Sequence, residues 1–249
     1  MELLALTTGE AIVLAGVAFV AGVVRGFTGF ALSALVMVAA VLILPPIELI
    51  PMLWWLEMTA SLLMVRSGWA EADRRVALRL VLTSAIGLPI GLVLTMSMSL
   101  AASALVALSV IVVLSVAQLA RVRLAFLGTS TGLAGAGLTA GIVTGLSGAG
   151  GMVVALCVLA LNMPARVIRA SLVLYLFVAL MVGFMTHVVV GTMDSAAVAR
   201  GLAFALPTAA GVLLGKALFV PRYERYYKPL CLGLLIALAM AGILRELAT

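Results

Sequence analysis

The sequence has little charge and few of the residues that carry out chemistry. Only 10% of its 249 residues are charged, and it has one histidine and two cysteines. Its mean hydropathy of +1.35 leaves too little polar surface for a fold in water. It contains no His-Glu-x-x-His motif and no cysteine near the single histidine, His187. We therefore expect a membrane protein that is not an enzyme and holds no metal or cofactor.

The net charge of +6 is spread along the chain rather than concentrated in one patch. Basic residues occur singly or in pairs between long apolar runs, which is typical of the loops of a multi-pass membrane protein. This distribution argues against a nucleic-acid partner and makes the lipid bilayer the expected environment.

Apolar runs account for most of the chain. Six segments are long enough to cross about 30 Å of hydrocarbon as helices, namely residues 47–65, 76–98, 100–120, 171–190, 197–220 and 229–247. Residues 10–44 and 132–163 are each too long for one span and too short for two full spans with a loop. Glycines interrupt them at residues 26–29 and 145–148, so we expect each to form a pair of half-helices.

The two interrupted stretches also mark an internal repeat. A shift of 119 positions superposes four glycine and proline pairs, Gly22 on Gly141, Gly26 on Gly145, Gly29 on Gly148 and Pro45 on Pro164. We therefore expect two transmembrane repeats, residues 1–125 and 126–249, each with a broken or re-entrant helix hairpin followed by three transmembrane helices.

The positions of the basic residues predict how the repeats are oriented. If each interrupted stretch returns to the side from which it entered, the basic residues within 66–79, 121–123, 166–169 and 222–228 all lie on one side. The positive-inside rule makes that side cytoplasmic and places both termini outside. The expected fold is thus an all-α polytopic membrane protein with two inverted-topology repeats. Re-entrant hairpins and short full spans give the same sidedness, and both stay open.

The breaks predict a binding site. Non-helical backbone inside a bilayer must face protein or a water-filled cavity, because its unpaired polar groups are costly to bury. The helices that begin near Gly29 and Gly148 direct free N–H groups and a positive dipole end at that cavity, which favours an anion. The alternative for the glycines upstream of the second break is close packing against a neighbouring helix.

We assign roles to individual residues on this basis. The expected substrate-binding residues are Arg25, Gly26, Thr28, Gly29, Ser33, Thr144, Ser147, Gly148, Gly150 and Tyr175. The expected gating residues are Phe27, Phe30 and Leu146. Trp54 is expected as an anchor at the outer membrane interface.

Two ionisable residues are candidates for coupling transport to an ion gradient. Glu57 lies near the middle of an apolar segment, where a charge costs roughly 2.5–3.5 kcal/mol on insertion scales. A coupling proton carrier and a structural ion pair are both consistent with its position. For His187 the alternatives are a proton relay and a hydrogen-bonded interfacial histidine.

The motifs at the breaks resemble those of a known transporter family. Residues 25–30 read Arg-Gly-Phe-Thr-Gly-Phe, residues 144–151 read Thr-Gly-Leu-Ser-Gly-Ala-Gly-Gly, and residues 164–170 read Pro-Ala-Arg-Val-Ile-Arg-Ala. This pattern is similar to that of the sulfite exporter TauE/SafE family, also called the 4-toluene sulfonate uptake permease family, over essentially the whole chain. The resemblance implies a bacterial inner-membrane carrier of sulfite, sulfonates or related small organic anions.

The function expected from these observations is secondary transport of a small anion by alternating access. The expected partners are the anionic substrate, the lipid bilayer, a coupling proton or sodium ion, and a second copy of the chain in a homodimer. A passive anion channel and a non-transporting membrane scaffold stay open as alternatives, because both can contain glycine breaks and inverted repeats.

Overall fold

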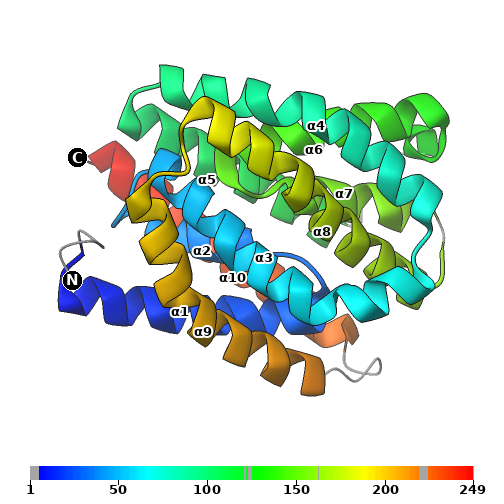
Figure 1. The fold of residues 1–249 in the computed structure, drawn as a ribbon, viewed down its shortest axis with the longest axis horizontal. Coiled ribbons are helices and arrows are strands. Elements are labelled where there is room, and N and C mark those ends of the chain that lie inside the picture. Colours follow the sequence, from blue (N-terminus) through cyan, green and yellow to red (C-terminus); the bar gives the residue numbers. More distant parts are fainter. Residues whose placement is uncertain (1–5, 121, 123–124, 162, 219–223, 249) are drawn as a thin grey trace.

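The computed structural model describes residues 6–120, 122, 125–161, 163–218 and 224–248. Within these ranges all regular secondary structure is helical (Figure 1). The elements are α1 (Thr8–Thr28), α2 (Leu32–Ala40), α3 (Pro46–Glu71), α4 (Arg74–Ser97), α5 (Leu100–Leu119), the short 3-10 helix η2 (Ala125–Gly128), α6 (Ser130–Ser147), α7 (Gly150–Ala160), α8 (Ala165–Val190), α9 (Ser195–Ala217) and α10 (Glu224–Ala248).

Six of the described helices are long and apolar enough to cross a membrane, so the chain is a multi-pass membrane protein. Five of them, α3, α4, α5, α8 and α9, coincide with expected spans, and the sixth is α1. The remaining expected span, 229–247, lies within α10. Residues 66–71 were expected in a loop, but α3 continues through Glu71 because no proline interrupts it there. The basic residues Arg121, Arg123 and Arg222 of the predicted cytoplasmic loops lie outside the described residues.

Both helix breaks occur at the predicted glycines. The left-handed residue Gly29 (φ 84°) ends α1, and Gly148 (φ 69°) ends α6 in the same way. The hydroxyl of Thr28 accepts a hydrogen bond from the Phe30 N–H at 3.3 Å, and that of Ser147 accepts one from the Ala149 N–H at 3.4 Å. Both breaks therefore have the same local structure: a left-handed glycine cap, and a side-chain hydroxyl that accepts a hydrogen bond from the backbone two residues later.

Each break separates a pair of helices, as expected, and the two arms of each pair differ in length. α1 has 21 residues and α2 has 9, whereas α6 has 18 and α7 has 11. The long arms run beside complete helices of the bundle: Gly26 of α1 lies against Lys216, in the last turn of α9. The short arms lie inside, and eight of the nine residues of α2 are buried.

Glycines bring the long arms into backbone contact with their neighbours. In α1, Gly22 and Gly26 face the backbone of α9 between Thr208 and Lys216, so the two helices run parallel. In α6, Gly141 and Gly145 face the α4 backbone between Ser84 and Leu92 in the same manner. Packing of small residues at a spacing of four lets membrane helices approach closely. The glycines upstream of the second break are thus packing residues.

These contacts cross between the two halves of the chain. The broken arm α1 of the first half packs on α9 of the second, and the broken arm α6 of the second half packs on α4 of the first. Each half in turn supplies one central helix, α3 or α8, and these two helices pack against each other. The described N-terminal part of α1 and the end of α10 lie at the same end of the bundle (Figure 1).

Candidate functional site

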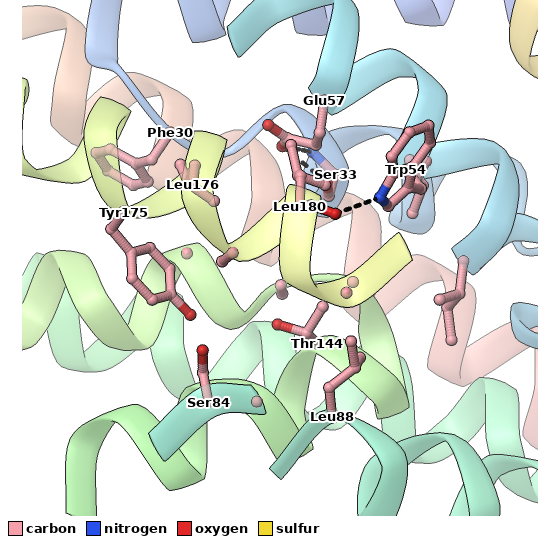
Figure 2. Close-up of a pocket in the computed structure, with 18 of the residues that line it drawn as sticks. Phe30, Ser33, Trp54, Glu57, Ser84, Leu88, Thr144, Tyr175, Leu176 and Leu180 are labelled. Carbon is pink, nitrogen blue, oxygen red and sulfur yellow. Dashed lines mark hydrogen bonds between the residues drawn. The ribbon is translucent and has the colours of Figure 1, made fainter. Parts of the chain in front are cut away.

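A partly open cavity lies among α2, α3, α4, α6, α7 and α8 (Figure 2). Both breaks contribute to its wall, the first through Phe30 and Ala31 and the second through Gly148 and Ala149. The breaks approach each other closely, since a Cβ atom at Gly148 would lie 3.5 Å from the Cβ of Ser33. Most of the wall is apolar. Its polar side chains are Ser33, Trp54, Glu57, Ser84, Thr144, Tyr175 and His187.

At the first break, the start of α2 binds a carboxylate of the protein itself. Ser33 donates its hydroxyl to Glu57 Oε1 at 2.7 Å and its backbone N–H to the same oxygen at 3.2 Å. Helix N-termini bind anions because their N–H groups are unpaired and the helix dipole is positive there. At this break, Glu57 thus occupies the helix start at which the sequence predicts a substrate anion.

Arg25 lies outside the cavity wall and forms an ion pair with the Glu57 carboxylate. Its Nη2 atom is 3.2 Å from Glu57 Oε2, and the arginine side chain has no exposed surface. The guanidinium also donates to the Gly29 carbonyl and, at 3.2 Å, to the hydroxyl of Ser61. A buried charge needs such partners because the Coulomb and hydrogen-bond energies must offset the loss of hydration.

A second arginine reaches the same break from the other half of the chain. Arg169 of α8 donates to the Gly26 carbonyl at 2.7 Å. The carbonyls of the last turn of α1 thus receive hydrogen bonds from two guanidinium groups, and cations at a helix C-terminus also interact favourably with its dipole. These contacts attach the first break to both α3 and α8.

The second break has a different chemistry. α7 begins at Gly150, and its N-cap residue Ala149 makes no side-chain capping bond. Gly148, Ala149 and Gly151 border the cavity there, next to Thr144, whose hydroxyl donates to the Ala140 carbonyl at 2.7 Å. The start of α7 therefore borders the cavity without a side-chain cap, and no carboxylate of the described residues bonds to its backbone N–H groups.

The residues at equivalent positions in the expected repeat also differ between the breaks. A shift of 119 positions carries Arg25 to Thr144, and it carries Glu57 to Leu176. The leucine packs on the start of α7, since a Cβ atom at Gly151 would lie 3.2 Å from Leu176 Cδ2. In that alignment, a hydroxyl and an apolar side chain of the second half stand at the positions of the Arg25–Glu57 pair.

The remaining polar groups lie around the cavity at separate points. The hydroxyl of Tyr175 faces Ser84, opposite Glu57 and Ser33 in Figure 2. Trp54 donates from Nε1 to the Leu180 carbonyl at 2.9 Å, which holds α3 against α8. His187 Nδ1 lies 2.9 Å from the hydroxyl of Thr192, so its hydrogen-bonding partner is outside the cavity.

The predicted site residues fall into two groups. Those in the cavity wall are Ser33, Thr144, Gly148, Tyr175, the predicted gate Phe30 and both coupling candidates, Glu57 and His187. Those outside the wall are Arg25, Gly26, Thr28, Gly29, Ser147, Gly150 and the predicted gates Phe27 and Leu146. The second group shapes or supports the breaks: Gly150, for example, is held against Thr144 and the Ala140 carbonyl.

Two polar wall residues were not predicted. Trp54 was expected at the membrane interface, and Ser84 was not singled out at all. Ser84 lies in an apolar span and donates to the Val81 carbonyl at 3.0 Å, an arrangement that any membrane helix can contain. No sequence signal distinguishes it, because its position opposite Tyr175 depends on how α4 packs on α8.

Comparison with known proteins identifies the family to which the chain belongs. The family model described as sulfite exporter TauE/SafE matches residues 14–241, which include both breaks and every helix that lines the cavity. The chain belongs to the TauE/SafE family. This TauE/SafE protein is accordingly a member of a family of membrane transporters rather than of enzymes. No curated protein and no solved structure matches the chain.

Proposed function

We propose that this TauE/SafE protein is a secondary transporter of a small anion in the bacterial inner membrane, with sulfite, an organosulfonate or a related organic acid as substrate. The observation that carries the proposal is the cavity between the breaks, which the uncapped start of α7 faces. A helix N-terminus has a positive partial charge of about one half and several free donors, which suits an oxyanion.

The composition of the cavity wall supports an anion that carries an organic group. Apolar side chains such as Ile50, Leu53 and Leu88 form much of the wall, and Ser33 and Thr144 add hydroxyl groups near the breaks. A sulfonate can direct its oxygens at the start of α7 and place its organic part against these side chains.

Alternating access is the mechanism that we propose for this transport. If the halves are inverted repeats, a cavity open to one side has a counterpart open to the other, and the halves interchange the two states. The reciprocal packing of α1 on α9 and of α6 on α4 supports this symmetry. Phe30, in the wall at the first break, is the proposed gate there. Saturable uptake into proteoliposomes that follows an imposed gradient is the expected behaviour, and single-channel currents would instead favour a channel.

Thr144→Val tests the anion site. The Thr144 hydroxyl donates a hydrogen bond to the Ala140 carbonyl. Rotation of this hydroxyl would let it donate instead to an anion at the start of α7. Its loss is expected to weaken anion binding by about 3- to 10-fold, the effect of one hydrogen bond. Isothermal titration of the purified protein with sulfite and benzenesulfonate measures this change.

Thr59→Val is the matched control for this experiment. Thr59 also donates to the carbonyl four residues earlier, that of Trp55, but it lies outside the cavity. Its replacement is expected to leave anion affinity unchanged. Equal losses in the two variants would show that the Thr144 hydroxyl supports the helix rather than the anion.

The proposed orientation can be tested by cysteine labelling. In a Cys157→Ala/Cys231→Ala background, we expect a cysteine at Ser195, at the start of α9, to react with an impermeant maleimide added to intact cells. A cysteine at Glu71, at the end of α3, is expected to react only after the membrane is permeabilised, because the neighbouring Arg74 and Arg75 favour the cytoplasmic side. The reverse labelling pattern would show that the protein has the opposite orientation in the membrane.

A further inference from the structure

We infer that Glu57 is the internal counter-anion of the cavity, and that the substrate anion replaces its carboxylate on Ser33 while Glu57 takes up a proton. This inference rests on the proposed function and deepens it, because it makes the proton the coupling ion and assigns it to one side chain. It also places the anion between Ser33 and the start of α7, where the two breaks meet.

The position of Glu57 is that of a bound ligand. Its Oε1 atom accepts both hydrogen bonds of Ser33 at the start of α2, and both residues belong to the cavity wall. Its Oε2 atom pairs with Arg25 but has no hydrogen-bond donor, although the residue is only 6% exposed. The same donors can serve a sulfonate or sulfite oxygen once the carboxylate leaves.

Charge balance requires a proton for this exchange. Arg25 is completely buried, and Glu57 is the acid paired with it in the described structure. An incoming anion beside an ionised Glu57 would place two negative charges on one positive charge in a poorly solvated site. Transfer of one proton from water to Glu57 gives a neutral carboxylic acid, and Arg25 then balances the substrate. One anion and one proton therefore enter the site together.

The other charged groups near α3 have different partners. Arg200 of α9 lies 2.5 Å from Glu48, and Lys216 of α9 donates to the Leu63 carbonyl at 3.1 Å. Arg169 of α8 donates to the Gly26 carbonyl, and the arginines of α4 lie at its start, at positions 74, 75 and 79. α2, α5 and α6 contain no charged residue.

Tyr175 and His187, both from α8, are the other titratable side chains in the described cavity wall. Ser33 donates its two hydrogen bonds to Glu57 rather than to either of them, and the second half has Leu176 at the position equivalent to Glu57. Glu57 therefore has no duplicate in the other repeat. This asymmetry predicts one coupled proton for each anion.

Isothermal titration with benzenesulfonate between about pH 5 and 8 tests the inference, because this strong acid keeps one charge over the whole range. In wild-type protein, the affinity for benzenesulfonate is expected to fall by up to about tenfold for each unit by which the pH rises, because Glu57 must be protonated for binding. Titrations in two buffers of different ionisation enthalpy should show uptake of about one proton per anion. Glu57→Gln should still bind benzenesulfonate, with an affinity independent of pH and with no proton uptake.

Glu48→Gln is the matched control, because it removes an acid from the other ion pair of α3, away from the cavity. It should retain the pH dependence of the wild type. If Glu57→Gln does not fold, Ser33→Ala gives a second test: it should weaken binding while proton uptake persists, since Glu57 is still present.

Three outcomes separate the possible failures. Wild-type binding that is independent of pH and releases or takes up no proton would overturn the inference and leave the proposed function intact. Proton uptake that persists in Glu57→Gln and disappears in His187→Gln would overturn it in favour of the histidine. Absence of binding and of flux for sulfite and organosulfonates in the wild type would overturn the proposed function itself.

Discussion

Replacement of Arg25 by methionine is expected to destabilise the protein by about 3–5 kcal/mol, because it leaves Glu57 buried without its positive partner. The pair lies deep in the bundle, with Arg25 fully buried and Glu57 only 6% exposed. The effect should appear as a lower midpoint in denaturant or thermal unfolding of the purified protein at neutral pH. The double variant Arg25→Met/Glu57→Gln should recover part of the loss, since no unpaired charge is left.

Arg200→Met is the comparison for this variant. It breaks the second ion pair of the described structure, in which the Glu48 side chain is 45% exposed. A freed Glu48 can be hydrated, so the expected loss is nearer to the value of about 1 kcal/mol typical of exposed pairs. If both arginine variants lose the same stability, the burial of Arg25 has no special energetic role.

Gly145→Val is expected to prevent stable packing of α6 on α4. A Cβ atom at this position would lie 2.7 Å from the Cα of Gly91, and it would also meet the backbone N of Leu92. Backbone atoms cannot rotate away, so the helices must separate and lose the 2.7 Å hydrogen bond from Thr95 to the Gly145 carbonyl. We expect a loss of about 3 kcal/mol or more, the upper part of the range for overpacked sites.

Gly135→Ala in the same helix is the control for Gly145→Val. A Cβ atom at Gly135 has no neighbour within 4 Å, so only helix propensity changes. The expected effect is a gain of up to about 1 kcal/mol. Unfolding midpoints of the two variants in the same detergent compare them directly, and a well-folded Gly145→Val protein would contradict the packing described here.

The sequence predicts the breaks well because they depend on local chemistry. A left-handed cap strongly favours glycine, and Gly29 and Gly148 both adopt that conformation. The lengths of the arms are harder to predict. In segments that are apolar on every side, helical periodicity is weak, and the length of α1 depends instead on its contact with α9.

The sequence predicted Glu57 and Arg25 as functional residues but not as partners. Their separation of 32 positions carries no signal, since the contact exists only because α1 and α3 pack together. The same limit applies to Ser84 and Trp54, whose places in the cavity wall depend on the packing of α8. Residue chemistry could be predicted from local patterns, whereas the distances between residues required the assembled bundle.

The reciprocal packing of the broken arms has an evolutionary consequence. Each half of the chain places its glycine-lined arm on a helix of the other, so neither half by itself satisfies its own close-packing surface. If the repeat of 119 positions arose by gene duplication, the half-length ancestor had to associate with a second copy in the opposite orientation. Such an ancestor would insert in both directions, and fusion of the two copies would then allow one to keep the Arg25–Glu57 pair while the other changed it.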